Sequence, residues 1–276
     1  MQISQWSRKK KVGMFFLLLV VIFSTYLLLK FPSNDRNWSL DQKILPYAEV
    51  KGDEIEVFNI RNFSYISTSE YTPSYYNKTF KLSDLESVDY IVEPFGSIGA
   101  AHTFLSFGFS TGDYLAVSVE IRKEVGESFS PLKGLLRNYE IMYVVADERD
   151  AVKLRSNFRK DDMYLYPVQT TKENIQKVFV DIINRVNTLK DKPEFYNTLT
   201  NTCTTNIVDH ANTIVPDRIP HDLRLLLPEN SDELAYEIGL IDNSVPLAEL
   251  RRTHHINELA EQYADSPDFS QKIRGK

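Results

Sequence analysis

An uncharged apolar stretch near the N-terminus limits what this chain can form more than any other feature. Residues 12–29 carry no charge, and residues 8–11 just before them are one arginine and three lysines. Eighteen helical residues, at about 1.5 Å each, just span a hydrocarbon core of roughly 30 Å. The preceding positive charges predict that residues 1–11 stay in the cytoplasm as a short tail and that the chain after Lys30 lies outside.

A cleaved signal peptide is the alternative interpretation of this stretch. The apolar region of a signal peptide is usually shorter, and small residues follow it. Here the chain continues with the bulky sequence YLLLKF at residues 26–31. We therefore expect an uncleaved transmembrane anchor at 12–29, a polar linker at 30–40 and one extracytoplasmic domain at 41–274.

The composition of the domain restricts its partners and its cofactors. A net charge of −6 argues against nucleic acid as a partner. Cys203 is the only cysteine, so no internal disulfide can form outside the cytoplasm. The chain lacks the CxxC and HExxH metal motifs and the GxGxxG and P-loop phosphate motifs. We therefore expect neither a metal nor a cofactor.

Hydrophobic periodicity predicts strands in the first half of the domain and helices in the second half. The predicted strands cover residues 54–60, 65–76, 90–94, 101–109, 114–121, 135–146 and 163–167. The predicted helices cover residues 150–158, 172–189, a segment starting near Cys203, and 231–238. This order predicts an α+β fold in which helices pack against an antiparallel sheet.

The cysteine lies in a polar run at the start of a helical pattern. Residues 200–206 read TNTCTTN, and apolar residues then recur at helical spacing from Ile207 onwards. Asn201 or Thr202 suits the N-cap position, which would place the sulfur in the first helical turn. The positive end of the helix dipole favours thiolate, the nucleophilic form. A buried Cys203 that acts only as a small hydrophobe is the alternative.

A thiol nucleophile needs a base and a group that orients this base, and His102 is the best candidate for the base. It opens the apolar 101–109 strand, beside small residues. If the hairpin turns near Thr111, His102 and Glu120 lie opposite one another, because both are nine residues from the turn. Glu120 would then orient the imidazole, whose other nitrogen would face Cys203.

Other assignments of these groups remain open. Glu120 could pair instead with Arg122 or Arg137, and two weaker candidates for orienting the imidazole are Ser118 and Asn206. His210 shares a helix face with the cysteine but lies about 10.5 Å further along the axis, so we interpret it as structural. The remaining histidines carry no strong signal: His221, His254 and His255.

Four segments carry a resemblance to a known family. They are AHTFLSFGF (101–109), VSVEIRKE (117–124), YVVADERD (143–150) and FYNTLTNTCTTN (195–206). Together they resemble the Lnb N-terminal periplasmic domain family, over roughly residues 38–274. That family is similar to permuted papain-like folds of the NlpC and lecithin:retinol acyltransferase kind, in which the histidine strand precedes the cysteine helix. The resemblance therefore implies a permuted papain-like fold.

The resemblance also implies thiol-based acyl transfer at a bacterial inner membrane, on its periplasmic side. The namesake member moves a fatty acyl chain from the diacylglyceryl group of a lipoprotein to the amino group of its N-terminal cysteine. By position, Cys203 would accept the acyl chain and His102 would be its base, and Glu120 is the third expected catalytic residue, with a less specific match to the family. The expected substrate is a diacylglyceryl lipoprotein or a phospholipid. The single membrane segment departs from the more elaborate membrane parts of transacylase members and leaves the exact substrate open.

Two other functions remain alternatives at this point. One is a cysteine hydrolase that acts on peptide or amide bonds of the cell wall, as the NlpC relatives do. The other is an anchored binding module in which Cys203 is inert. An acyltransferase needs an apolar groove, which Phe104, Phe107 and Phe109 would suit unless they are plain core residues.

Overall fold

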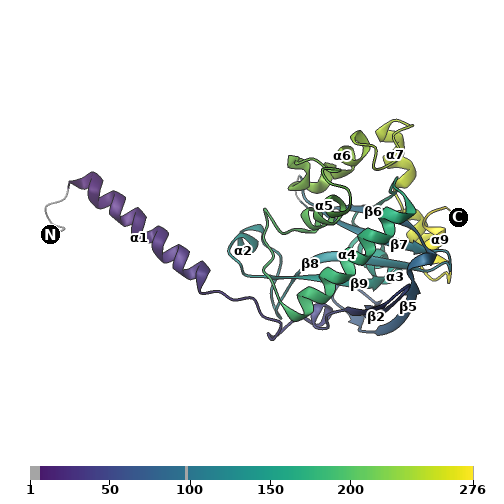
Figure 1. The fold of residues 1–276 in the computed structure, drawn as a ribbon, viewed down its shortest axis with the longest axis horizontal. Coiled ribbons are helices and arrows are strands. Elements are labelled where there is room, and N and C mark those ends of the chain that lie inside the picture. Colours follow the sequence, from purple (N-terminus) through teal and green to yellow (C-terminus); the bar gives the residue numbers. More distant parts are fainter. Residues whose placement is uncertain (1–6, 97–98, 276) are drawn as a thin grey trace.

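The computed structural model describes residues 7–96 and 99–275 and shows a long helix that stands apart from a folded domain (Figure 1). The helix, α1 (Arg8–Leu28), has a mean hydropathy of 2.2 and none of its residues is buried. Its length and composition suffice to cross a membrane. The predicted apolar stretch is therefore helical, and the helix also includes the basic residues before it.

The centre of the domain is an eight-stranded sheet in which the strand order is β1-β2-β9-β8-β7-β6-β10, with β5 pairing to β2. Its strands are β1 (Tyr47–Lys51), β2 (Glu54–Arg61), β5 (Tyr75–Lys81), β6 (Leu85–Pro94), β7 (Ala101–Phe109), β8 (Tyr114–Arg122), β9 (Glu140–Asp147) and β10 (Tyr164–Pro167). The pairs are antiparallel except β2 with β9, which meet in parallel at Arg61 and Ala146. A separate small hairpin joins β3 (Ser64–Tyr65) to β4 (Tyr71–Thr72).

The register of the β7–β8 hairpin is the one that a turn near Thr111 predicts. Phe104 pairs with Ser118, and the pairing continues to Gly108 with Tyr114. Extending the same register by two residues brings His102 level with Glu120. The predicted proximity of these two residues is therefore confirmed at the level of the backbone.

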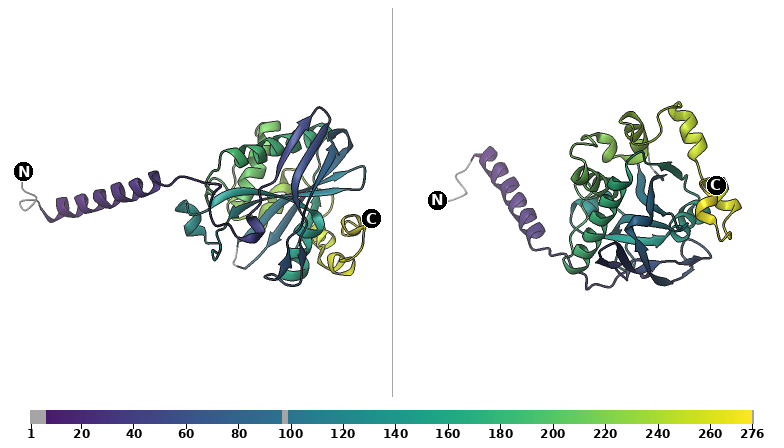
Figure 2. Two further views of the ribbon diagram at one scale, coloured as in Figure 1. Left: turned by 90° about the horizontal axis from the view of Figure 1, so that it is seen from below. Right: turned by 45° about the vertical axis from the view of Figure 1, so that its right-hand side comes forward.

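Helices cover both faces of the sheet. On one face, here called the α5 face, lie α4 (Lys172–Asp191) and α5 (Cys203–Ile214). On the other, the α3 face, lie α3 (Glu148–Lys153), the π-helix η4 (Leu154–Arg159), α8 (Asn257–Gln262) and α9 (Phe269–Lys272). Figure 2 shows the C-terminal helices, in yellow, across the sheet from the green helices. The predicted α+β class with packed helices is confirmed.

Several boundaries differ from the prediction for local reasons. Residues 135–139, predicted as the start of a strand, instead end α2 (Pro131–Leu135) and form a turn in which Arg137 has a φ of 54°. Pro131 favours a helix start because its fixed φ suits the first turn. β6 begins at Leu85 rather than residue 90. Its charged residue Asp89 is buried in an ion pair with Arg274, a partner that no local pattern could reveal.

The single strand predicted at residues 65–76 is wrong, because that range contains the end of β3, the whole of β4 and only the start of β5. Four further elements were not predicted. β1, α7 (Leu247–His254), α8 and α9 were missed, whereas α6 (Ser231–Glu237) was expected and ends before Gly239 at φ +64°. The short 3-10 helices are η2 (Leu40–Gln42), η3 (Leu82–Asp84), η5 (Leu223–Leu225) and η6 (Pro228–Asn230).

The segment between α1 and the domain is held against the domain. The Ser33 backbone N–H donates to the Glu140 carboxylate at 3.0 Å, and Arg36 Nε forms an ion pair with the same carboxylate at 2.8 Å. Asn34 Nδ2 donates to the Leu189 carbonyl at 3.0 Å. The predicted linker is thus a strap that fixes where α1 leaves the domain.

Candidate functional site

Cys203 is the first residue of α5, and a capping box closes the start of this helix. The Thr202 hydroxyl accepts from the Thr205 backbone N–H at 3.2 Å, and the Thr205 hydroxyl accepts from the Thr202 N–H at 2.8 Å. This reciprocal capping box satisfies two of the free donors at the helix start. The prediction that the sulfur lies in the first turn, with Thr202 as a possible N-cap, is confirmed.

The thiol is buried beside hydroxyl groups. Cys203 is 8% exposed, and its Sγ lies 3.7 Å from the Thr204 hydroxyl oxygen. Tyr90 of β6 and Tyr196 lie near the thiol. Burial raises the pKa of both phenols, and the neighbouring thiol adds to the rise. The immediate surroundings of the sulfur are therefore neutral hydroxyl and apolar groups.

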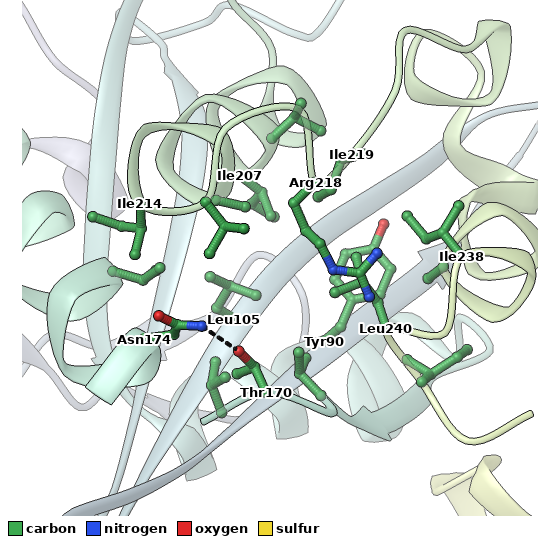
Figure 3. A pocket seen from close by; sticks show the side chains of 18 of the residues that line it. Tyr90, Leu105, Thr170, Asn174, Ile207, Ile214, Arg218, Ile219, Ile238 and Leu240 are labelled. Carbon is green, nitrogen blue, oxygen red and sulfur yellow. Dashed lines mark hydrogen bonds between the residues drawn. The ribbon is translucent and has the colours of Figure 1, made fainter. Parts of the chain in front are cut away.

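An apolar cavity runs along the helix that carries the cysteine. Its volume is about 170 Å³, and it lies between α5, α4, α6 and the sheet (Figure 3). The α5 side chains that line it are Thr204, Ile207, Val208, Ala211 and Ile214. The ten-residue span from Thr204 to Ile214 corresponds to roughly 15 Å of helix. The cavity thus begins one residue after Cys203 and follows the same helix to its end.

The floor of the cavity is the sheet, and its rim carries polar groups. Tyr90 and Leu105 form part of the floor. At the rim Asn174 Nδ2 donates to the Thr170 hydroxyl at 3.2 Å, and the Arg218 side chain reaches across in front of Tyr90 (Figure 3). Thr170 is exposed and Arg218 is half-buried, so the cavity opens to the surface on this side.

His102 and Cys203 lie on opposite faces of the sheet. Thr103 points to the α5 face, because its hydroxyl oxygen lies 3.0 Å from that of Thr204. Successive side chains on a strand point to opposite faces, so His102 points to the α3 face. Its ring stacks there on Phe104, at a centroid distance of 5.8 Å. This structure therefore does not place the imidazole against the thiol, and the role of His102 as base stays a prediction.

His102 belongs instead to a polar chain on the α3 face. Its Nε2 lies 2.7 Å from the Ser118 hydroxyl, and that hydroxyl donates to Glu120 at 3.0 Å. Arg155 of η4 donates to Glu120 at 2.8 Å and to Glu93 at 2.7 Å. Glu120 therefore acts on His102 through Ser118. The predicted group of His102 with Glu120 does form, and Ser118, the weaker candidate, is the residue that links them.

Charge and burial keep the His102 imidazole neutral. Burial, followed by the positive charge of Arg155, lowers the pKa of His102 to about 3. Burial alone would raise the pKa of Glu120, but nearby cations, Arg155 first, outweigh it and lower that pKa. Burial raises the pKa of Glu93 to about 7. At neutral pH His102 is thus uncharged beside the ionised Glu120.

A second histidine, His210, supports the cysteine helix. Its Nδ1 lies 2.6 Å from the Asp181 carboxylate of α4, and its Nε2 lies 2.6 Å from the Tyr143 hydroxyl of β9. That hydroxyl also donates to Asn206 of α5 at 3.1 Å. The structural interpretation of His210 is therefore consistent with its contacts. Sequence reasoning missed Tyr143 and Asp181, because no pattern connects segments so far apart in the chain.

The three phenylalanines proposed for an apolar groove are core residues. The Phe107 ring packs on Phe179 of α4 at 5.0 Å, and Phe109 packs on the same ring at 5.9 Å. Phe104 is fully buried on the opposite face. They face different cores because they alternate along one strand. Within residues 7–96 and 99–275, no group of three His, Cys, Asp or Glu residues could hold a metal ion.

The fold and site define an α+β domain in which a cysteine begins a capped helix, and later residues of that helix line an apolar cavity. The model of the Lnb N-terminal periplasmic domain family matches residues 71–229, more than half of the chain, and the match includes both Cys203 and His102. The chain belongs to this family, and together with the apolar helix α1 this fits a membrane-anchored periplasmic protein. No curated protein and no solved structure matches the chain.

Proposed function

We propose that this protein is an acyltransferase in which Cys203 carries the acyl group as a thioester. One observation carries the proposal: the helix that begins with the cysteine also lines the apolar cavity. An acyl chain is apolar and binds best where it removes apolar surface from water. A cell-wall peptide is polar and gains little from such a lining, so the cavity favours acyl transfer over the hydrolase alternative.

The reaction has two balanced steps. In the first, the Cys203 sulfur attacks the carbonyl carbon of a fatty acyl ester, the ester C–O bond breaks, and the thiol proton ends on the released alcohol. In the second, an amine attacks the thioester carbonyl, the C–N bond of an amide forms as the C–S bond breaks, and a proton from the amine returns to the released sulfur. The sulfur lies in the first turn of α5, at the positive end of the helix dipole. The apolar lining would limit hydrolysis between the two steps.

His102 has a positioning role in this proposal. The His102–Ser118–Glu120 chain fixes the β7–β8 pair on the α3 face, and Thr103 on the other side of β7 contacts Thr204 next to the thiol. The proton balance of both steps closes without the imidazole. A direct role as base would require His102 to change faces, because its strand now directs it away from Cys203.

The proposed substrates and location follow from the family and the anchor. The donor would be a diacylglyceryl lipoprotein or a phospholipid, and the catalytic domain would lie on the periplasmic side of the bacterial inner membrane, held by α1 as an uncleaved single-pass anchor. A permuted papain-like arrangement is part of the same proposal, supported by a histidine strand that precedes the cysteine helix.

Filling the cavity tests the proposal. Ala211→Trp would place an indole in the cavity, whereas Thr213→Trp would place it on the exposed face of the same helix. The substrate is a diacylglyceryl lipopeptide, and the measured product is the lipopeptide whose diacylglyceryl group has lost one fatty acyl chain. Formation of this product should fall at least tenfold in the first variant and stay near wild type in the second. Equal activity in both variants, with intact folds, would contradict an acyl site in this cavity.

A further inference from the structure

Exposed apolar side chains gather where α1 leaves the domain. Phe129, Leu132 and Leu135, on and beside α2, are 47%, 64% and 38% exposed, and Leu199, in the turn that precedes α5, is 54% exposed. Figures 1 and 2 show α2 on the side of the domain that faces α1. We call these four residues the α2 patch. Apolar groups of this size, grouped on one side, indicate an interaction surface.

Contacts at the C-terminal end of α1 hold the α2 patch beside the point where that helix ends. Lys30, two residues after α1, donates its Nζ to the Leu136 carbonyl at 2.9 Å and also contacts Asn138. Arg137 donates to the Leu27 carbonyl in the last turn of α1 at 3.3 Å. Because these contacts join the end of α1 to the residues directly after α2, a membrane crossed by α1 would meet α2 at its surface.

The charges and aromatic ring around this junction also suit a lipid interface. Lys30 lies 4.5 Å above the Tyr26 ring, and Lys133 is exposed within α2. Cations beside apolar side chains favour a surface that combines anionic headgroups with acyl chains. Tyrosine and lysine are also typical of the ends of membrane-spanning helices.

The α2 patch is connected to the cysteine through one turn. The Thr198 hydroxyl donates to the Pro131 carbonyl at 2.7 Å, so the turn at residues 197–201 packs on α2. Cys203 follows that turn by two residues. A domain that rests on α2 would therefore keep the start of α5 close to the membrane surface.

From these observations we propose that the α2 patch inserts into the lipid–water interface and seats the domain on the membrane in one orientation. The inference uses no chemistry of Cys203, so it stands or falls separately from the proposed acyl transfer. The occupant is the bilayer itself, because the patch continues the surface from which α1 emerges.

The test measures the depth of single fluorescent labels in the full chain. In a Cys203→Ser background, Leu132→Cys carries an NBD label, and the protein is reconstituted into vesicles of phosphatidylethanolamine and phosphatidylglycerol. Ile66→Cys is the matched control, because Ile66 is 71% exposed but lies in the β3–β4 hairpin, where the neighbouring Tyr65 ring contacts Phe158 of η4. Thermal melting curves of the unlabelled proteins check that both variants fold.

With brominated acyl chains in the vesicles, the label at position 132 should lose most of its emission and the label at position 66 should lose little. A label at Leu199→Cys should behave like the one at 132. Unquenched, water-like emission at position 132 would overturn the proposal and assign the patch to a protein partner. Equal quenching at 132 and 66 would overturn it too, because it would show adsorption without a preferred face.

Discussion

The hydroxyl oxygens of Thr103 and Thr204 lie 3.0 Å apart, and this contact joins strand β7 of the central sheet to the first turn of α5. Both side chains are buried, at 0% and 2% exposure. This contact fixes the height of α5 over β7, and it also shows which way the strand faces. Because Thr103 points to α5, its neighbour His102 points away from Cys203.

Removing this contact should weaken both the fold and the reaction. Thr103→Val keeps the shape of the side chain but leaves the buried Thr204 hydroxyl without that partner, which costs about 1–3 kcal/mol. We expect a lower free energy of unfolding in urea and slower acylation of Cys203. Thr79→Val, at an exposed strand position, is the control and should match wild type in both measurements. A Thr103→Val variant as stable as the control would show that the contact is not important.

The neutral, half-buried His102 should make the fold sensitive to acid. Its pKa is lowered to about 3, against 6.5 in the unfolded chain, so between these values the unfolded chain binds a proton that the folded chain does not. The free energy of unfolding should therefore fall as the pH drops from about 6.5 toward 3, by up to about 1.4 kcal/mol per pH unit. Glu93, whose pKa is raised to about 7, has the opposite effect between about 4.5 and 7.

Comparing wild type with His102→Gln removes the contribution of Glu93, which is common to both chains, and leaves that of His102 together with its effect on Glu120. Urea titrations at pH 7 and pH 4.5 should show wild type losing more stability than the variant. An identical pH dependence would contradict a neutral imidazole in the folded protein.

The His102→Gln variant should still form an acyl adduct on Cys203. Loss of the adduct with an intact fold would restore His102 as the base.

The anchor gives a prediction about the mature N-terminus. If α1 is uncleaved, the mature chain begins with its cytoplasmic tail and stays with the membrane fraction after an alkaline wash. N-terminal sequencing of the membrane-bound protein is the measurement. A released species that begins near Ser33 would show that the helix is a cleaved signal peptide.

The sequence sufficed for features that depend on neighbouring residues. The N-cap at Thr202, the long amphipathic α4 and the register of the β7–β8 hairpin all follow from short-range patterns, and the structure has each of them. The hairpin register was accurate enough to bring His102 beside the Ser118–Glu120 pair. The family was also identifiable from the segments around His102 and Cys203.

Short-range patterns could not predict that His102 and Cys203 lie on opposite faces of the sheet. Periodicity shows that alternate residues of β7 face different sides, but both sides are apolar here, with Phe104 on one and Leu105 on the other. The pattern therefore does not tell which side α5 covers. The buried charges on the α3 face have the same difficulty, since Arg155 and Arg274 pair with acids more than 30 residues away.

The most direct test is the intact mass of the purified full chain mixed with a diacylglyceryl lipopeptide whose amino terminus is blocked. Without an acceptor amine, the acyl group should remain on the protein. We expect a mass gain of one fatty acyl group that neutral hydroxylamine removes and that Cys203→Ala does not show. If wild type shows no adduct under these conditions while the same preparation cleaves cell-wall peptides, the thioester proposal is wrong and the protein is a hydrolase.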